Sequence, residues 1–418
     1  MKIKYSKELI NLNIDKSYDV LYKQLDLKPL SSDDILNELN TNPIYSDTLY
    51  NVIEQANRIL IILPDVTRKS GAEKFLQQML NKIEDKGKDV SFIFAIGTHR
   101  AMTEDEIKLI MTEKVYNKYK HKIIPHDSDD ISAHEYYGKT SNNTPILINR
   151  AYFDHDTIIP IASVSYHYFA GFGGGRKMIV PGIAAKKTIM ANHKLVLDEK
   201  NKRKHEYAIT GNLKQNPVHD DLVNCVMIAR RHKTFFLINT ILDESSNIIY
   251  ACGGDLFMSH IAATEKLKEL TSIKIEYKYD AAIVSCGGYP KDINLVQAQK
   301  SLDRAKTVVK DGGKIFFFAK CQDGYGNKYF QDFFDLKTSS EMFDILLKDY
   351  QINRQTAFNL KSILEKYEVY IFSDFDKYDT DRMGFKHLED LGEIPALIND
   401  CERIAFIPDA YNFFFETN

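Results

Sequence analysis

The sequence predicts an α/β protein made of two Rossmann-like domains, each with a mostly parallel sheet, and an active-site cleft between the domains. Two observations predict this class. Short apolar runs alternate with longer stretches of helical periodicity, which is the pattern of a parallel sheet covered by helices. The chain has 418 residues, which is more than one ordinary hydrophobic core accommodates, so two domains are expected.

The clearest alternation opens the first domain. Apolar runs at residues 59–63 and 90–96 predict two buried strands, and residues 71–86 predict the helix between them. A second helix is expected to begin near Thr103, because Thr103 and Glu106 have the spacing of a capping box. Together these elements make a βαβα unit.

The later elements are weaker signals of the same kind. Further strands are expected at 145–148, 157–162, 234–238, 281–285, 314–319 and 368–372, and further helices at 256–270, 294–310 and across 327–366. A polar segment near residue 275 interrupts the alternation, so we expect an N-terminal domain over residues 1–274 and a C-terminal domain over residues 275–400. The apolar run 404–408 in the tail, residues 401–418, could finish the second sheet or return to the first domain.

Composition excludes several classes of function. The formal net charge is −3, with 55 basic and 58 acidic residues, so nothing predicts binding to nucleic acid or to an anionic membrane surface. The N-terminal segment does not resemble a signal peptide, and no apolar run approaches the roughly 20 residues that cross a bilayer. The five cysteines are scattered without a CxxC pair, so neither a disulfide framework nor a thiolate zinc site is predicted. These features predict a cytoplasmic protein.

Two strand ends in the first domain carry polar side chains. Asp65, Thr67 and Arg68 follow the first strand, and His99 follows the second. Ligands of open α/β folds bind at the carboxyl ends of parallel strands, where Arg68 offers a planar cation suited to phosphate or carboxylate. His99 can exchange a proton near neutral pH. The simpler alternatives are that Asp65 or Thr67 caps the next helix and that His99 is a solvated loop residue.

A glycine-rich loop follows a later buried strand. It reads SYHYFAGFGGGRK and contains His167, Gly174, Gly175 and Lys177. Glycine permits positive φ and a close approach of backbone to a ligand, as nucleotide and phosphate loops require. The spacing matches neither a P-loop nor a dinucleotide-binding fingerprint. A flexible loop or tight turn is the structural alternative.

Three further residues complete the set. His193 lies sixteen residues beyond Lys177, and a histidine considered alone is a metal ligand only occasionally. Gln297 and Lys300 are three residues apart on a helix of the second domain, so they share one face. That face could hold an anion between the domains or simply be solvated.

The ordered set of motifs resembles the lactate racemase family that uses a nickel-pincer nucleotide. The resemblance runs from about Asp65 to Lys300 and comprises DVTR, GTHR, a histidine before the glycine loop and its lysine, a second histidine, and GGYP followed by QxxK. The spacing of His167, Lys177 and His193 is its most specific part. The two-domain α/β outline is also that of the family.

This resemblance implies a cofactor and a role for each residue. The cofactor is nickel held by pyridinium-3,5-bisthiocarboxylic acid mononucleotide, supplied by dedicated cofactor-synthesis enzymes. Lys177 would carry it covalently, and His193 would be the nickel ligand. The implied cofactor contacts are Asp65, Thr67, Arg68, Gly174, Gly175 and Gln297, and the implied contacts to the substrate carboxylate are Arg68 and Lys300.

The resemblance also implies the reaction. Members invert C2 of a small 2-hydroxy acid through a planar keto acid, and the cofactor supplies the hydride chemistry. His99 and His167 are the implied acid/base pair, because a proton must be removed from the hydroxyl of either enantiomer.

Two positions depart from the family pattern and bear on the substrate. The family has a small residue before the lysine and an aromatic residue before the glutamine, whereas this chain has Arg176 and Val296. Val296 could leave room for a larger substrate, and Arg176, if it faces the pocket, could favour a second carboxylate. The alternatives to a racemase are a nicotinamide-dependent 2-hydroxy acid dehydrogenase, although GxGxxG is missing, and a non-catalytic two-lobed binding protein.

Overall fold

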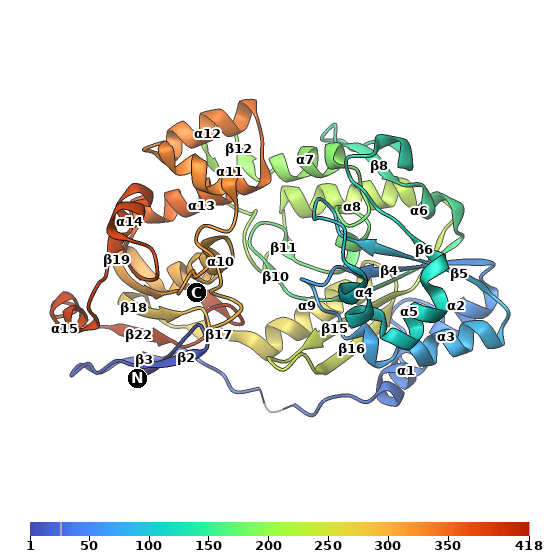
Figure 1. Cartoon of the computed structure of the whole chain (residues 1–418), viewed down its shortest axis with the longest axis horizontal. Coiled ribbons are helices and arrows are strands. Elements are labelled where there is room, and N and C mark those ends of the chain that lie inside the picture. The colour runs from blue at the N-terminus through green and yellow to red at the C-terminus, as the bar shows by residue number, and fades with distance from the viewer. Residues whose placement is uncertain (26, 418) are drawn as a thin grey trace. The chain divides into compact units, whose positions relative to one another are not determined.

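The computed structural model describes residues 1–25 and 27–417 as a mixed α/β structure with two compact units (Figure 1). The larger unit comprises Leu25–Val196 and Glu206–Glu269, and the smaller unit comprises Met1–Gln24, Leu197–His205 and Leu270–Asn418. Each unit has its own mostly parallel sheet, which confirms the predicted fold class. Among the described residues, no helix has the length and apolar character needed to cross a membrane.

A seven-stranded sheet forms the centre of the larger unit. Its order is β16-β15-β9-β4-β5-β6 with β14 paired to β9, and every pair except β15 with β16 is parallel. The strands are β4 Arg58–Pro64, β5 Asp89–Ala95, β6 Ile123–Ile124, β9 Thr157–Ser163, β14 Thr234–Phe235, β15 Leu237–Leu242 and β16 Ile248–Gly254. Because β9, β4 and β5 are adjacent and parallel, their carboxyl ends meet at one edge of the sheet.

Helices cover the larger sheet because its central strands are apolar on both faces. Ile59, Ile61 and Leu63 of β4 belong to the core that α1–α5 cover, and the alternate residues Leu60 and Ile62 are equally buried. The helices are α1 Ser32–Thr41, α2 Leu49–Gln55, α3 Leu76–Asp85, α4 Glu104–Met111, α5 Glu113–Tyr119, α6 Arg150–Asp154, α7 Lys186–Lys194, α8 Pro217–Arg230 and α9 Met258–Thr271. The predicted capping box of Thr103 and Glu106 is present at the start of α4.

Two predicted strands of this unit differ in detail. The run at 145–148 forms β8 Pro145–Asn149, which pairs antiparallel with β7 His134–Lys139 outside the main sheet. The run at 234–238 is divided between β14 and β15, which both pair with β9. Hydrophobic periodicity identifies strands but does not specify their partners.

The smaller unit contains a six-stranded, fully parallel sheet of order β21-β20-β19-β18-β22-β3. Its strands are β3 Asp19–Val20, β18 Tyr279–Ser285, β19 Val309–Phe318, β20 Glu368–Phe372, β21 Lys386–His387 and β22 Ile404–Ile407. Its helices are α10 Leu295–Ala305, α11 Lys328–Asp332, α12 Ser339–Lys348, α13 Ile352–Lys366, α14 Lys377–Met383 and α15 Ile394–Leu397. Three two-stranded sheets accompany them in this unit: β1 Lys2–Tyr5 with β2 Glu8–Asn11, β12 Leu197–Asp198 with β13 Arg203–Lys204, and β17 Ser272–Ile275 with β23 Phe414–Thr417.

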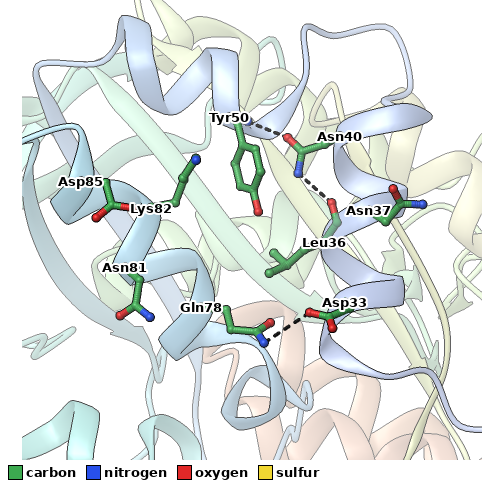
Figure 2. A pocket seen from close by; sticks show the side chains of 9 residues that line it. All are labelled: Asp33, Leu36, Asn37, Asn40, Tyr50, Gln78, Asn81, Lys82 and Asp85. Carbon is green, nitrogen blue, oxygen red and sulfur yellow. Dashed lines mark hydrogen bonds between the residues drawn. The ribbon is translucent and has the colours of Figure 1, made fainter.

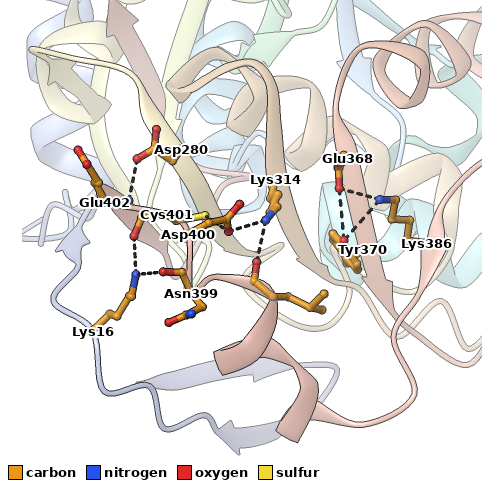
Figure 3. A network of polar contacts seen from close by, with 11 residues as sticks. Lys16, Asp280, Lys314, Glu368, Tyr370, Lys386, Asn399, Asp400, Cys401 and Glu402 are labelled. Carbon is orange, nitrogen blue, oxygen red and sulfur yellow. Dashed lines mark hydrogen bonds and ion pairs between the residues drawn. The ribbon is translucent and has the colours of Figure 1, made fainter.

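The units differ from the predicted domains because both ends of the chain belong to the smaller unit. The apolar run in the tail forms β22, which lies between β18 and β3 in the sheet. The amino-terminal segment is tied to the same region, since Lys16 Nζ donates to the carbonyls of Asn399 at 2.6 Å and Cys401 at 2.8 Å (Figure 3). Local sequence patterns contain no information on such long-range pairing.

Candidate active site

Asp65 and His99 meet at the carboxyl edge of the larger sheet. Pro64 at the end of β4 is paired with Ala95 at the end of β5, so the loops that follow begin side by side. The Oδ2 atom of Asp65 lies 2.5 Å from Nδ1 of His99. Asp65 is 3% exposed, whereas the His99 side chain is 50% exposed. The imidazole therefore reaches solvent while the carboxylate behind it is buried.

The surroundings of Asp65 keep its carboxylate charged. Burial raises its pKa, but hydrogen bonds from His99 and Thr67 and the positive charges of His99 and Arg68 outweigh burial, so the pKa lies below its ordinary value. Thr67 donates its N–H at 2.9 Å and its hydroxyl at 2.6 Å to Oδ1. The next helical turn begins at Ala72 without a side-chain cap. The interpretation of Asp65 or Thr67 as a helix cap is therefore wrong.

His167 lies in a short hairpin that follows β9. The hairpin pairs β10 Tyr166–His167 with β11 Gly171–Phe172 in antiparallel register. The backbone N–H of Ala170 donates to Nδ1 of His167 at 3.2 Å. Because Nδ1 accepts this bond, the neutral ring carries its proton on Nε2.

The buried ring of Phe169 brings three of the expected site residues together. Its centroid lies 4.5 Å from that of His167 and 4.9 Å from that of His193, and both pairs are edge-to-face. Lys177 Nζ lies 5.8 Å from the same centroid. One aromatic side chain therefore connects the hairpin, the glycine loop and α7.

His193 is buried near the end of α7 and is held neutral. Burial is the main cause that lowers its pKa to about 3, and the positive charges of Lys177 and Arg68 lower it further. Its Nδ1 lies 3.2 Å from Oδ1 of Asn192, and the ring also has a hydrogen bond to the backbone of Ile189. Both acceptors favour a proton on Nδ1, which leaves the lone pair on Nε2. Over residues 1–25 and 27–417, no three His, Cys, Asp or Glu side chains are grouped as a metal site.

Asn192 and Asp221 orient His193, and sequence reasoning missed both. The amide nitrogen of Asn192 donates to the carbonyl of Val218 at 3.1 Å and to Oδ2 of Asp221 at 3.0 Å. These two acceptors fix the amide so that Oδ1 faces His193. Asp221 is itself buried and accepts a hydroxyl hydrogen bond from Thr140 at 2.6 Å. The available signal was an Asn inside a helix directly before His193, since Asn favours caps over helix interiors.

The glycine loop approaches other parts of this chain closely. Gly174 has φ of 72°, and a Cβ there would lie 2.9 Å from the carbonyl oxygen of Ser163. Gly175 has φ of 56°, and a Cβ there would lie 2.5 Å from the ring of His260. Both glycines are thus required by packing within the protein.

Arg176 does not present its guanidinium to a ligand. The residue is 1% exposed, and it donates to the carbonyls of Ala170 at 2.9 Å and Phe172 at 3.0 Å. Burial lowers its pKa to about 9. The expectation that Arg176 could favour a second substrate carboxylate is not supported, because the side chain turns back onto its own hairpin.

Gln297 and Lys300 are partners on α10 in the smaller unit. Lys300 Nζ donates to Oε1 of Gln297 at 2.5 Å, and both residues are half-buried. The contact follows from their three-residue spacing on a helix. Val296, the position that departs from the family pattern, lies on the same helix and is also half-buried.

Family models and known proteins that match this sequence are all described as lactate racemases. The lactate racemase N-terminal domain model matches residues 5–205, and the lactate racemase C-terminal domain model matches residues 273–410. The lactate racemase of Thermoanaerobacterium thermosaccharolyticum is 30% identical over 394 residues, which cover 91% of this chain and 89% of that protein. The lactate racemase of Lactiplantibacillus plantarum is 32% identical over 367 residues, which cover 86% and 84%.

Solved structures extend this agreement to the fold. The lactate racemase apoprotein of T. thermosaccharolyticum superposes with a TM-score of 0.87 at 28% identity, covering 100% of this chain and 99% of that one. A Thermotoga maritima protein has the same fold, with a TM-score of 0.68 at 16% identity over 95% of this chain and 100% of that one. Two family models and two relatives thus span most of the sequence. This chain belongs to the lactate racemase family of isomerases.

Proposed function

We propose that this racemase inverts C2 of a small 2-hydroxy acid, with lactate as the first substrate to test. The observation that carries the proposal is the grouping of His167, Lys177 and His193 around Phe169. It places a proton carrier, an amine and a neutral imidazole within one small region. The names of the curated relatives support lactate as the starting point.

The residues of this region fit nickel and pyridinium-3,5-bisthiocarboxylic acid mononucleotide. Lys177 is the proposed covalent anchor, and His193 is the proposed nickel ligand through Nε2. The acceptors on its Nδ1 support this role, because metal-binding histidines usually donate their other ring N–H to a protein oxygen. Arg68 is also a proposed cofactor contact, since its charge acts on His193. When bound, the cofactor supplies the acceptor and donor of the C2 hydride.

His99 and His167 are the proposed acid/base pair. The carboxylate of Asp65 accepts the Nδ1 proton of His99, so Nε2 of His99 has the lone pair that removes a hydroxyl proton. His167 exchanges its proton with the substrate oxygen from the opposite face. Their roles reverse with the enantiomer, which is why both are needed.

The remaining expected residues are proposed to bind the substrate or to fix the conformation of the loops. We propose that Arg68 and Lys300 bind the substrate carboxylate and that Gln297 holds the Lys300 amine. Thr67 is proposed to act on the cofactor through the loop that it ties to Asp65. Gly174 and Gly175 are proposed to act by shaping the backbone that carries Lys177.

The cysteines and the proposed cofactor indicate where the enzyme works and which other enzymes it needs. We propose that it works in the cytoplasm, which its five free and buried cysteines support. It depends on cofactor-synthesis enzymes, because its own chain must receive a complete nucleotide. Val296 is the remaining position that argues for a substrate larger than lactate.

The test uses protein co-expressed with the cofactor-synthesis enzymes. Intact mass should show an adduct on Lys177, metal analysis should show nickel, and chiral chromatography should show interconversion over a panel of 2-hydroxy acids. The Lys177→Ala variant should lose the adduct, whereas Lys187→Ala, an exposed change on α7, should keep it. Wild-type protein with neither adduct nor nickel would refute the cofactor assignment.

The orientation of His193 can be tested separately. Asn192→Ala removes one of the two acceptors on Nδ1, so nickel should be lost to a chelator about tenfold faster. Asn81→Ala, an exposed change on α3, is the control. Equal nickel loss from Asn192→Ala and wild type would remove Asn192 from this role.

A further inference from the structure

The smaller unit contains a cavity of about 370 Å³ with a strongly basic lining. Three consecutive cations, Lys202, Arg203 and Lys204, reach it from the β12–β13 hairpin. Lys306 and Lys366 line it from the end of α10 and from α13, and Glu365 is the carboxylate among its lining residues. All of these residues belong to one unit, and the proposed racemase site uses none of them.

Two lysines of this basic cavity act on a buried carboxylate that lies outside its lining. Asp303 is 4% exposed, and it accepts from Lys306 Nζ at 2.6 Å and from Asn359 Nδ2 at 3.2 Å. The charge of Lys204 acts on the same carboxylate. Two amines of the lining, those of Lys204 and Lys306, thus act on the carboxylate of Asp303.

The outer cations of the basic cavity are held by weak pairs. Lys202 lies 3.0 Å from Asp344 and Lys366 lies 2.9 Å from Asp311, and all four side chains are exposed. Arg203 lies 3.8 Å from Asp198. Exposed ion pairs contribute little to stability. An anion that enters the cavity can therefore take over these cations at little cost.

The remaining lining indicates what kind of anion fits. Ser339, Ser362 and Asn359 add neutral hydrogen-bonding groups, and Phe358 and Tyr367 add aromatic surface. The planar guanidinium of Arg203 suits the oxygens of a phosphoryl group. The volume exceeds that of a phosphate ion alone and is typical of small-ligand sites. We propose that this basic cavity binds a small phosphate ester, with the phosphoryl dianion among the lysines.

A second cavity of similar size lacks a basic lining, so the lysines and the arginine distinguish the first cavity. It measures about 390 Å³ and lies between α1, α2 and α3 of the larger unit. Figure 2 shows side-chain amides around it, together with Asp33, Asp85 and a single lysine, Lys82. Its charged residues do not favour an anion, so Lys82→Met is a matched control for removing a lysine from a cavity.

The test measures calorimetric binding of inorganic phosphate and phenyl phosphate to the full chain at constant ionic strength. Phenyl phosphate should bind more tightly than inorganic phosphate, because only the ester uses the aromatic surface. Lys204→Met and Arg203→Met should each weaken ester binding at least about tenfold, while Lys82→Met leaves it unchanged. Arg203 is exposed, so its variant keeps the test valid if Lys204→Met fails to fold.

Three outcomes would overturn the proposal. They are no saturable binding to wild type, equal affinity in wild type and Arg203→Met, and binding of sulfate or citrate as tight as that of the ester. Tighter binding of inorganic phosphate than of phenyl phosphate would assign the site to the free ion instead. None of these results depends on nickel or on racemase activity, so the racemase proposal is tested independently.

Discussion

His99 and His167 are proposed for the same proton chemistry, yet the protein holds them in opposite ways. Nδ1 of His99 faces a buried carboxylate, and half of its side chain is exposed at the sheet edge. Nδ1 of His167 accepts a backbone N–H from Ala170, and its ring packs against buried Phe169. One imidazole is oriented by a charge and the other by the backbone of a hairpin.

The difference identifies what each histidine depends on. Ala170 is held through both of its backbone polar groups, since its N–H donates to His167 and its carbonyl accepts from buried Arg176. Loss of packing in the hairpin should therefore disturb His167 and leave His99 in place. A change of charge at Asp65 should disturb His99 alone.

The largest expected effect is the loss of either histidine. His99→Ala and His167→Ala should each lower the racemisation rate of the nickel-loaded enzyme by at least about 10³-fold, because general acid/base groups contribute roughly 10² to 10⁴. Chiral chromatography of the product measures the rate. His121→Ala, an exposed change elsewhere in the larger unit, should keep full activity. Normal racemisation by either active-site variant would remove that histidine from the mechanism.

The next effect isolates the carboxylate behind His99. Asp65→Asn should lower the racemisation rate about 10²-fold, or about 2.7 kcal/mol, because an amide N–H facing Nδ1 favours the wrong tautomer of the ring. Nitrogen-15 NMR of the apoprotein should show His99 changing tautomer while His167 stays on Nε2. A change at both rings would show that the two sites are not independent.

Much of this fold was predictable because its central strands are apolar on both faces. Uninterrupted apolar runs such as that of β4 identify buried parallel strands, and the box of Thr103 and Glu106 gives the start of α4 correctly. The predicted strand ends also placed Asp65 and His99 on neighbouring loops, because parallel strands end at the same edge. These features depend on residues that are close in the sequence.

The remaining features depend on residues that are far apart. Asn192 bonds to Asp221 on another helix, and Arg176 folds back onto carbonyls that no local pattern identifies. The same applies to the pairing of β3 with β22, which connects the two ends of the chain. The histidine roles came from resemblance and not from spacing, since one histidine in a loop is compatible with many functions.

A smaller effect tests the packing behind His167. Arg176→Met removes two hydrogen bonds to carbonyls in a buried hairpin, which should lower the free energy of unfolding by about 2 to 3 kcal/mol. Urea unfolding of the apoprotein measures it. Arg100→Met at the exposed edge, where Arg100 pairs with Glu106, should have no measurable effect. Similar losses in the two variants would contradict the contrast between a buried hairpin and an exposed edge.

The smallest expected effect is a pH dependence of the free energy of unfolding, which comes from histidines buried near Arg176. Burial and then the charge of Arg176 lower the pKa of His219 to about 3, and burial also lowers that of His260. A histidine whose pKa is lowered in the folded state takes up a proton only after unfolding, so stability falls as pH drops below about 6.5. At pH 5 the loss from His219 is about 2 kcal/mol.

His219→Gln should remove this share of the acid sensitivity between pH 7 and pH 5 in urea unfolding, whereas His121→Ala should not. Asp65 at the sheet edge should not contribute to this acid sensitivity. Its pKa is lowered, so its carboxylate stays charged between pH 7 and pH 5. Asp65 contributes stability that is lost only as pH falls further, through its own lowered pKa. An unchanged pH slope in His219→Gln would show that burial and the charge of Arg176 do not hold this histidine neutral.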